Sequence, residues 1–205
     1  MGAELRLMTT SRDETPDDDR SLIEECLAGD TAAFEELVRR KTSKVYGHCL
    51  RMLGNVEDAR DIAQLVFIRL WEKLEKYDSS YTFDTWLYRL VSNVTIDFVR
   101  SRQTRDNAVH SSLRLVKDSQ EPAQPSMVAG KEVERIFEEV SESLSPKQKQ
   151  VFVMKEIDDL TSPEIAEILE CSESTVRNHL FNARKVLRRE LEQRYPEYAQ
   201  LWSDQ

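Results

Sequence analysis

One helical face near the C-terminal end carries side chains that could read DNA bases. It lies in EIAEILECSESTVRNHL, residues 164–180, and in the few residues that follow. Asn suits adenine, Arg suits guanine or a phosphate, Phe suits a thymine methyl group, and Lys suits the backbone. An ordinary helical hairpin with a solvated polar face is the alternative. The outward residues are Glu173, Ser174, Arg177, Asn178, Phe181, Asn182, Arg184 and Lys185.

A second set of side chains, between residues 77 and 102, mixes aromatic rings with cations. Single-stranded nucleic acid is bound in this way, because bases stack on rings while cations follow the phosphates. For each ring, a place in the hydrophobic core is the alternative. The rings are Tyr77, Tyr81, Phe83, Trp86, Tyr88 and Phe98, and the polar residues beside them are Arg89, Asn93, Arg100 and Arg102.

A third set, on residues 58–73, alternates charges of both signs with two large aromatic side chains, Phe67 and Trp71. Such a face is typical of a protein-docking surface. A merely solvated face is the equal alternative. Its polar members are Asp58, Asp61, Gln64, Arg69, Glu72 and Lys73.

The elements that must position these side chains are predicted to be helices. Good helix formers dominate, the chain has only 5 glycines, and no run has the length or alternation of a strand. The third predicted helix carries its apolar residues at helical spacing: Ile62, Leu65, Val66, Ile68, Leu70 and Leu74. We therefore expect an all-α protein of two helical domains joined by a flexible linker. The expected ranges are an acidic disordered tail (1–19), a four-helix domain (20–103), the linker (104–130), a helix-turn-helix domain (131–195) and a C-terminal tail (196–205).

Local signals mark where these helices begin and end. Gly29 and Gly54 are predicted to end the first two helices. In the second domain, Ser145 before Pro146 begins one helix, the pair Thr161 and Glu164 forms a capping box for the next, and Ser172 begins the last. Glu170 occupies a turn that often needs a left-handed backbone. Either the turn avoids that conformation, or the domain accepts a small loss of stability.

Charge is distributed unevenly along the chain, whose formal net charge is −9. Residues 131–170 carry 11 acidic and 5 basic groups, a net −6, whereas residues 171–194 carry 3 and 6, a net +3. The cationic groups are therefore gathered beside the helices expected on DNA.

Several classes of protein are disfavoured by the same sequence. Three widely spaced cysteines, Cys26, Cys49 and Cys171, argue against a disulfide framework and against a metal site. No apolar run is long enough for membrane insertion, and no secretory signal pattern is present, so we expect a soluble, cytoplasmic protein. No catalytic constellation or cofactor motif is present, which disfavours an enzyme.

Together, these blocks resemble bacterial RNA polymerase sigma factors of the extracytoplasmic-function (ECF) type. The resemblance is carried by AFEELVRRKTSKVYGHCLRMLGNVEDARDIAQLVFIRLWEKL, then FDTWLYRLVSNVTIDFVRSR, a linker, and LSPKQKQVFVMKEIDDLTSPEIAEILECSESTVRNHLFNARKVLRREL. These correspond to the second and fourth conserved sigma regions and cover roughly residues 20–195.

The resemblance implies a role for each set of residues. Polymerase docking, on the clamp coiled coil of the largest subunit, would fall to Asp58, Asp61, Gln64, Phe67 and Trp71. Melting and reading of the minus-10 element would fall to Lys76, Tyr77, Asp78, Ser79, Ser80, Tyr81, Trp86, Arg89, Asn93, Asp97 and Arg100. Reading of the minus-35 element would fall to Ser174, Thr175, Arg177, Asn178, Phe181, Asn182, Arg184 and Lys185.

The function implied is promoter selection for core RNA polymerase without any covalent chemistry. The implied partners are promoter DNA, the clamp and flap regions of core polymerase, and an anti-sigma factor that holds the protein inactive. Two alternatives are a stand-alone helix-turn-helix regulator, which would not need the helix at residues 55–75, and a sigma mimic that only sequesters anti-sigma proteins.

Overall fold

The computed structural model describes residues 16–112 and 129–199, and within these ranges all regular structure is helical. This confirms the predicted fold class. Among the described helices, none combines the length and apolar character needed to cross a bilayer. Most of the predicted tails and the middle of the predicted linker lie outside the described residues.

The first domain is built from α1 (Pro16–Leu27), α2 (Thr31–Leu53), α3 (Val56–Lys73), the short η2 (Leu74–Lys76) and α4 (Phe83–Ser112). Asp30 begins α2 by accepting hydrogen bonds from two backbone N–H groups, and Gly54 ends it at φ 64°. Glycine suits that position because a left-handed backbone strains other residues. The α2–α4 core contains fully buried side chains such as Leu37, Val66 and Leu70.

The ends of α1 and α4 differ from the prediction. Helix α1 begins at Pro16, inside the expected tail, and Asp19 is buried with its carboxylate 2.6 Å from the Lys41 ammonium. This ion pair supports the first turns of α1 against α2. Helix α4 continues to Ser112, inside the expected linker, because neither glycine nor proline interrupts residues 104–112.

The second domain contains α5 (Ala129–Ser141), α6 (Pro146–Phe152), one turn of π-helix, η3 (Val153–Ile157), α7 (Ser162–Ile168), α8 (Glu173–Arg194) and the short α9 (Pro196–Ala199). The three predicted starts are confirmed. Ser145 forms a capping box with Gln148, Thr161 forms one with Glu164, and the Ser172 hydroxyl accepts from the Thr175 N–H.

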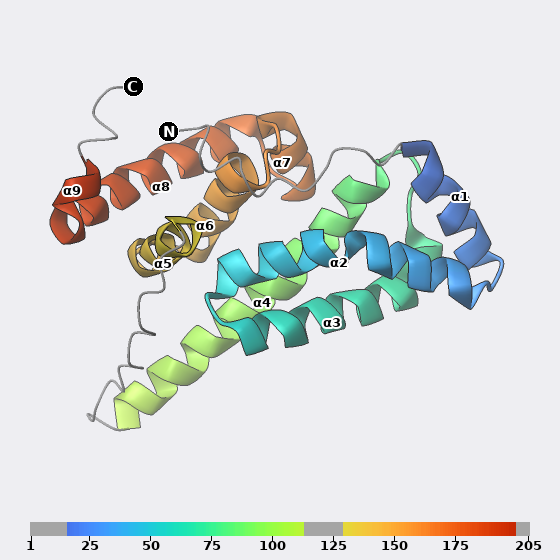
Figure 1. The fold of residues 1–205 in the computed structure, drawn as a ribbon, viewed down its shortest axis with the longest axis horizontal. Helices are drawn as coiled ribbons and strands as arrows, with labels where there is room; N and C mark the ends of the chain where they lie inside the picture. Colours follow the sequence, from blue (N-terminus) through green and yellow to red (C-terminus); the bar gives the residue numbers. More distant parts are fainter. Residues whose placement is uncertain (1–15, 113–128, 200–205) are drawn as a thin grey trace.

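The two domains pack against each other along α2 and α4 (Figure 1). Tyr88 of α4 is buried in the hydrophobic cluster of the second domain, beside residues such as Val151 and Ile165. Met52 and Ile96 form a smaller cluster with Val153 of η3. The sequence predicted two domains on a linker and contained no sign of this packing.

Candidate functional site

Helices α7 and α8 form the predicted helix-turn-helix. Ile165 and Val176 are fully buried between them, and Ala166 is buried where the helices cross. Because α7 is only seven residues long, its capping box contributes a large share of the hydrogen bonds that hold it. The turn thereby fixes the angle at which α8 presents its outer face.

Glu170 adopts the left-handed conformation in the turn, with φ 52°. Its N–H donates to the Glu167 carbonyl at 3.3 Å, and the Cys171 N–H donates to the Ala166 carbonyl at 2.9 Å. These two bonds define a Schellman motif, whose left-handed position is usually glycine. Of the two possibilities left by the sequence, the strained turn is therefore the one found.

The predicted minus-35 readers lie on the outward face of α8. Phe181 is the most exposed large apolar side chain among the described residues, at 67%. Asn182 is half-buried, whereas the other predicted readers on α8 are exposed. The exposed readers are Ser174, Thr175, Arg177, Asn178, Phe181, Arg184 and Lys185.

Several of these side chains pair with neighbouring residues of the protein. The Arg177 guanidinium lies 3.2 Å from Glu173, and the Arg184 guanidinium lies 2.6 Å from Glu156 of η3. The Asn182 amide donates to the Asn178 side-chain oxygen at 3.2 Å. Exposed pairs of this kind contribute little free energy, so they can exchange for contacts with base edges or phosphates. The hydroxyls of Ser174 and Thr175 instead bond to Ser172 and shape the start of α8.

The loop before α4 is held by its own aromatic residues. Tyr77 donates to the Tyr81 carbonyl at 2.8 Å, and its ring centroid lies 5.5 Å from that of Trp86. Tyr77 and Trp86 are partly buried against the first core, so the core alternative holds for much of each ring. At the loop tip, the Ser80 N–H donates to Asp78 and lowers the pKa of that carboxyl. Lys76, Asp78, Ser79 and Ser80 are exposed.

One face of α4 carries the remaining minus-10 candidates. Asn93, Asp97 and Arg100 are exposed and follow one another at intervals of four and three residues, which places them on one side of the helix. Arg89 begins this row but is engaged elsewhere. Its guanidinium lies over the Tyr81 ring, donates to the Glu167 carbonyl at 2.9 Å and lies 3.6 Å from the Glu170 carboxylate.

The predicted docking face of α3 is exposed, with one correction. Asp61, Gln64 and Trp71 face solvent, whereas Phe67 packs partly against the core. Ile68, one of the apolar residues at helical spacing in the sequence, is 48% exposed, as is Trp71. At about 100° per residue, Ile68 points away from the buried Val66 and joins the outward row of residues 61, 64 and 71. This outward position of Ile68 was predictable from the sequence, because its helical angle relative to Val66 follows from the residue spacing alone.

Asp58 begins the docking face and pairs with α4. Its carboxylate lies 2.9 Å from the Arg102 guanidinium, and the start of α3 is capped by Asn55, which accepts from the Asp58 N–H. The start of the docking face on α3 is therefore tied to α4 by an ion pair between neighbouring helices.

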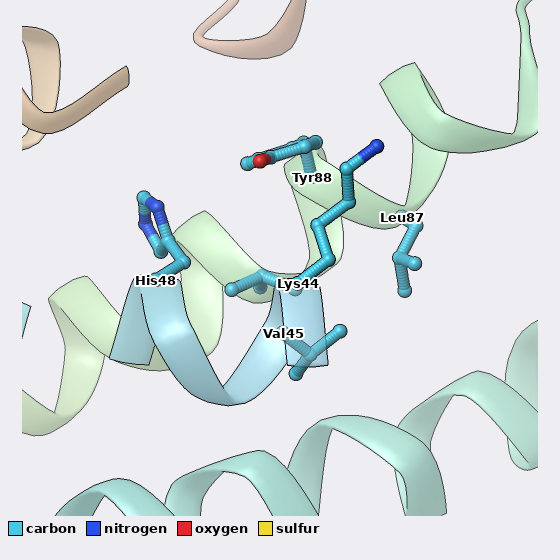
Figure 2. Close-up of a pocket in the computed structure, with 6 residues that line it drawn as sticks. Lys44, Val45, His48, Leu87 and Tyr88 are labelled. Atoms are coloured by element: carbon cyan, nitrogen blue, oxygen red, sulfur yellow. The ribbon is translucent and has the colours of Figure 1, made fainter. Parts of the chain in front are cut away.

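The interdomain contact contains buried charges that sequence reasoning missed. His48 and Tyr88 project from α2 and α4 to the same side (Figure 2), with ring centroids 5.7 Å apart. Nδ1 of His48 lies 2.7 Å from the carboxylate of Asp158, which also pairs with Arg51. Polar residues at helical spacing are equally typical of a solvated face, so no signal in the sequence indicates this contact.

Two family models match parts of the chain. The model described as Sigma-70 region 2 matches residues 37–105, and the model described as Sigma-70, region 4, matches residues 134–187. The first extends from within α2 to within α4, and the second extends from within α5 to within α8. The ECF RNA polymerase sigma factor SigW of Bacillus subtilis is 35% identical over 176 residues, which is 82% of this chain and 94% of that protein.

Solved structures share the fold. CnrH, solved in complex with the cytosolic domain of CnrY, matches with a TM-score of 0.63 at 22% identity, covering 86% of this chain and 99% of that one. The sigma factor RpoE from Bartonella quintana, solved with the anti-sigma factor NepR, matches with a TM-score of 0.59 at 16% identity, covering 78% and 96%.

Proposed function

Because the chain belongs to the ECF sigma factors of the sigma-70 family, we propose that it binds core RNA polymerase and directs it to specific promoters. The second domain reads the minus-35 element through α8. The first domain melts and reads the minus-10 element through α4 and the loop before it. The α3 face docks on the polymerase clamp, and the second domain meets the flap region.

One observation supports this assignment above the others: three separate rows of exposed side chains lie on three different helices. Asp61, Gln64, Ile68 and Trp71 follow one side of α3, Asn93, Asp97 and Arg100 follow one side of α4, and Arg177, Asn178, Phe181 and Arg184 face outward on α8. A stand-alone helix-turn-helix regulator would need only the last row. The apolar and acidic row on α3 suits a protein partner, whereas the row on α8 suits a DNA major groove.

The mechanism requires binding energy and no covalent step. Contacts with polymerase and with duplex DNA offset the cost of unstacking a few base pairs, roughly a few kcal/mol for each flipped base. Rings such as Tyr81 and Trp86 then stack on the exposed bases, while Arg100 balances phosphate charge. The protein therefore acts by positioning polymerase and not as an enzyme.

We also infer control by an anti-sigma factor and action in the cytoplasm. Family membership supports both. CnrH and RpoE, which share the fold, were each solved in complex with a partner protein, and in the case of RpoE that partner is an anti-sigma factor.

In vitro transcription with purified core polymerase tests the proposal. Wild-type protein is expected to give promoter-dependent transcripts, whereas Asp61→Lys combined with Trp71→Ala should lose them together with core binding. The matched control is Glu134→Lys with Val133→Ala, which changes an exposed charge and an exposed apolar residue on α5.

Each alternative function predicts a different result. A stand-alone regulator would bind its promoter equally well with and without the α3 changes. A sigma mimic would bind its protein partners and give no transcript with core enzyme. Intact binding of the double variant to core polymerase would overturn the docking assignment.

A further inference from the structure

The two arginines among the exposed readers of α8 are each paired with a carboxylate. The Arg177 guanidinium lies 3.2 Å from Glu173, one turn earlier on the same helix, and the Arg184 guanidinium lies 2.6 Å from Glu156 of η3. Lys185 is exposed and has no ion-pair partner in the described part of the chain. The three cations and two carboxylates leave a net charge of +1, so this face attracts phosphates only weakly.

The π-helical turn η3 brings Glu156 to Arg184. Val153 and Met154 of this turn are fully buried in the core and fix its position. Residues two apart on a helix point to nearly opposite sides, so Glu156 reaches α8 while Asp158 reaches α2. Single π-helical turns are frequent at functional sites. The pair of Glu156 with Arg184 is therefore set by the fold of the second domain and not by spacing along one helix.

Arg177 and Arg184 point the same way from α8. Seven residues take a helix through almost two full turns, so the two side chains lie on one side of it, about 10 Å apart along the axis. Phe181, which is 67% exposed, lies between them on the same side. Successive base pairs are about 3.4 Å apart, so this spacing corresponds to about three base pairs in a major groove.

A guanidinium that is paired with a carboxylate still has donors for a guanine. Arginine has five N–H donors in a flat fork, and Nη2 of Arg184 supplies one of them to Glu156. Guanine presents two acceptors, O6 and N7, in the major groove, and these suit two of the donors that remain. Arg184 can therefore read a guanine while its ion pair with Glu156 stays in place.

A phosphate is a poorer ligand for the same paired arginine. The pair has no net charge, so its approach to a phosphate releases little of the counterion atmosphere that drives non-specific binding. Both pairs are exposed and weak in water, so the arginines are able to leave them. A departing arginine, however, leaves a bare carboxylate beside phosphates of the same charge, which repel it. The pairing therefore disfavours phosphate contacts more than guanine contacts.

We propose that Glu156 and Glu173 determine specificity at the minus-35 element. They hold Arg184 and Arg177 as guanine readers and suppress the binding of these arginines to phosphates. This inference rests on the proposed function of α8. It predicts an element with two guanines about three base pairs apart. Both glutamates are positioning residues, because they act on DNA through the arginines.

Selection from a duplex DNA library with a block of random base pairs tests the base preference. The binding species is holoenzyme reconstituted from the full chain and core polymerase. Wild-type holoenzyme should enrich guanine at two positions, of which Arg184→Ala loses one and Arg177→Ala loses the other. Glu156→Gln should lower the guanine preference at the Arg184 position by about threefold or more, and Glu173→Gln should do so at the Arg177 position.

Binding of the same holoenzymes to one scrambled duplex tests the suppression of phosphate contacts. Each glutamine variant should bind this duplex more tightly, and the slope of log affinity against log salt should steepen by about one. The matched control is Glu192→Gln, which removes the same charge from a 2.9 Å pair with Arg188 on the same helix. The control should keep the guanine preference of the wild type.

A double variant separates this role from a purely structural one. Glu156→Gln combined with Arg184→Ala should have the guanine preference of Arg184→Ala alone, because the glutamate acts only through the arginine. A further loss in the double variant would overturn the positioning role. Equal weakening on all sequences in the single glutamate variants would overturn it as well, since a misfolded helix-turn-helix gives that result.

The outcomes also separate failure of this inference from failure of the proposed function. If the wild type enriches guanine but Glu156→Gln and Glu173→Gln enrich it equally well, the inference is refuted while minus-35 reading stands. If the wild-type holoenzyme enriches no sequence from the library, the proposed function fails and the inference fails with it.

Discussion

Replacing Glu170 by glycine should stabilise the second domain. Glu170 occupies the left-handed position of a Schellman motif at φ 52°, where a residue with a Cβ carries a strain of about 1–2 kcal/mol. Glycine removes the strain but makes the unfolded chain more flexible, which costs about 0.4–1 kcal/mol. The ion pair with Arg89 spans 3.6 Å to a carboxylate that is 72% exposed, so its loss costs a few tenths of a kcal/mol at most. The net gain is about 0.5–1 kcal/mol.

Urea denaturation followed by circular dichroism measures this gain. With a slope of about 2 kcal/mol per molar urea, the midpoint of the second domain should rise by about 0.3–0.5 M. Glu170→Asn should give a similar rise, since Asn tolerates the same backbone without the full flexibility of glycine. Glu167→Gly is the matched control: it changes the same residue type in the right-handed α7 and should cost about 1 kcal/mol. If Glu170→Gly lowers the midpoint as much as the control does, the side chain contributes more than its strain costs, and the reasoning is wrong.

Three further changes test the proposed surfaces and the buried carboxylate. Asn178→Ala should weaken holoenzyme binding to a matching minus-35 element by about 1–3 kcal/mol and leave scrambled DNA unaffected in competition assays; equal loss on both would show a backbone contact. Ile68→Ser, at an exposed site, should reduce affinity for core polymerase in a pull-down titration by at least about 1 kcal/mol, while thermal stability changes by less than about 0.5 kcal/mol. Burial raises the pKa of Asp158, but the hydrogen bond from His48 and the charges of His48 and Arg51 outweigh it and hold that pKa below its ordinary value. Its stabilisation is therefore present above about pH 4 and lost as pH falls through the lowered pKa, so Asp158→Asn should flatten the acid limb of a stability profile measured at successive pH values.

Local signals in the sequence were sufficient to predict the helices and several of their starts. Ser145, Thr161 and Ser172 begin helices as expected, because each cap depends on residues within one turn of it. The extra turns of α4 were missed for the same local reason. Polar residues such as those at 104–112 are as compatible with a helix as with a linker, and no breaker among them decides between the two.

Contacts between distant parts of the chain could not be predicted in this way. Tyr88 belongs to an aromatic and cationic stretch that suggested base stacking, yet its ring is buried in the core of the second domain. His48 and Asp158, separated by 110 positions in sequence, form a buried pair. Polar residues are usually exposed, so nothing in either segment indicates that each would be buried against the other.

Two of the acidic residues have a structural role in addition to any effect of the net charge on DNA binding. Acidic surface suppresses non-specific DNA binding, and that argument applies to any acidic residue. Within the acidic stretch of residues 131–170, however, Asp158 and Glu170 face Arg51 and Arg89 of the first domain. Salt screens buried pairs far less than exposed ones, so at physiological ionic strength Asp158 contributes most of the electrostatic attraction between the two domains and Glu170 contributes little. The ion pair between Glu170 and Arg89 is therefore too weak to offset the strain of the left-handed backbone at Glu170.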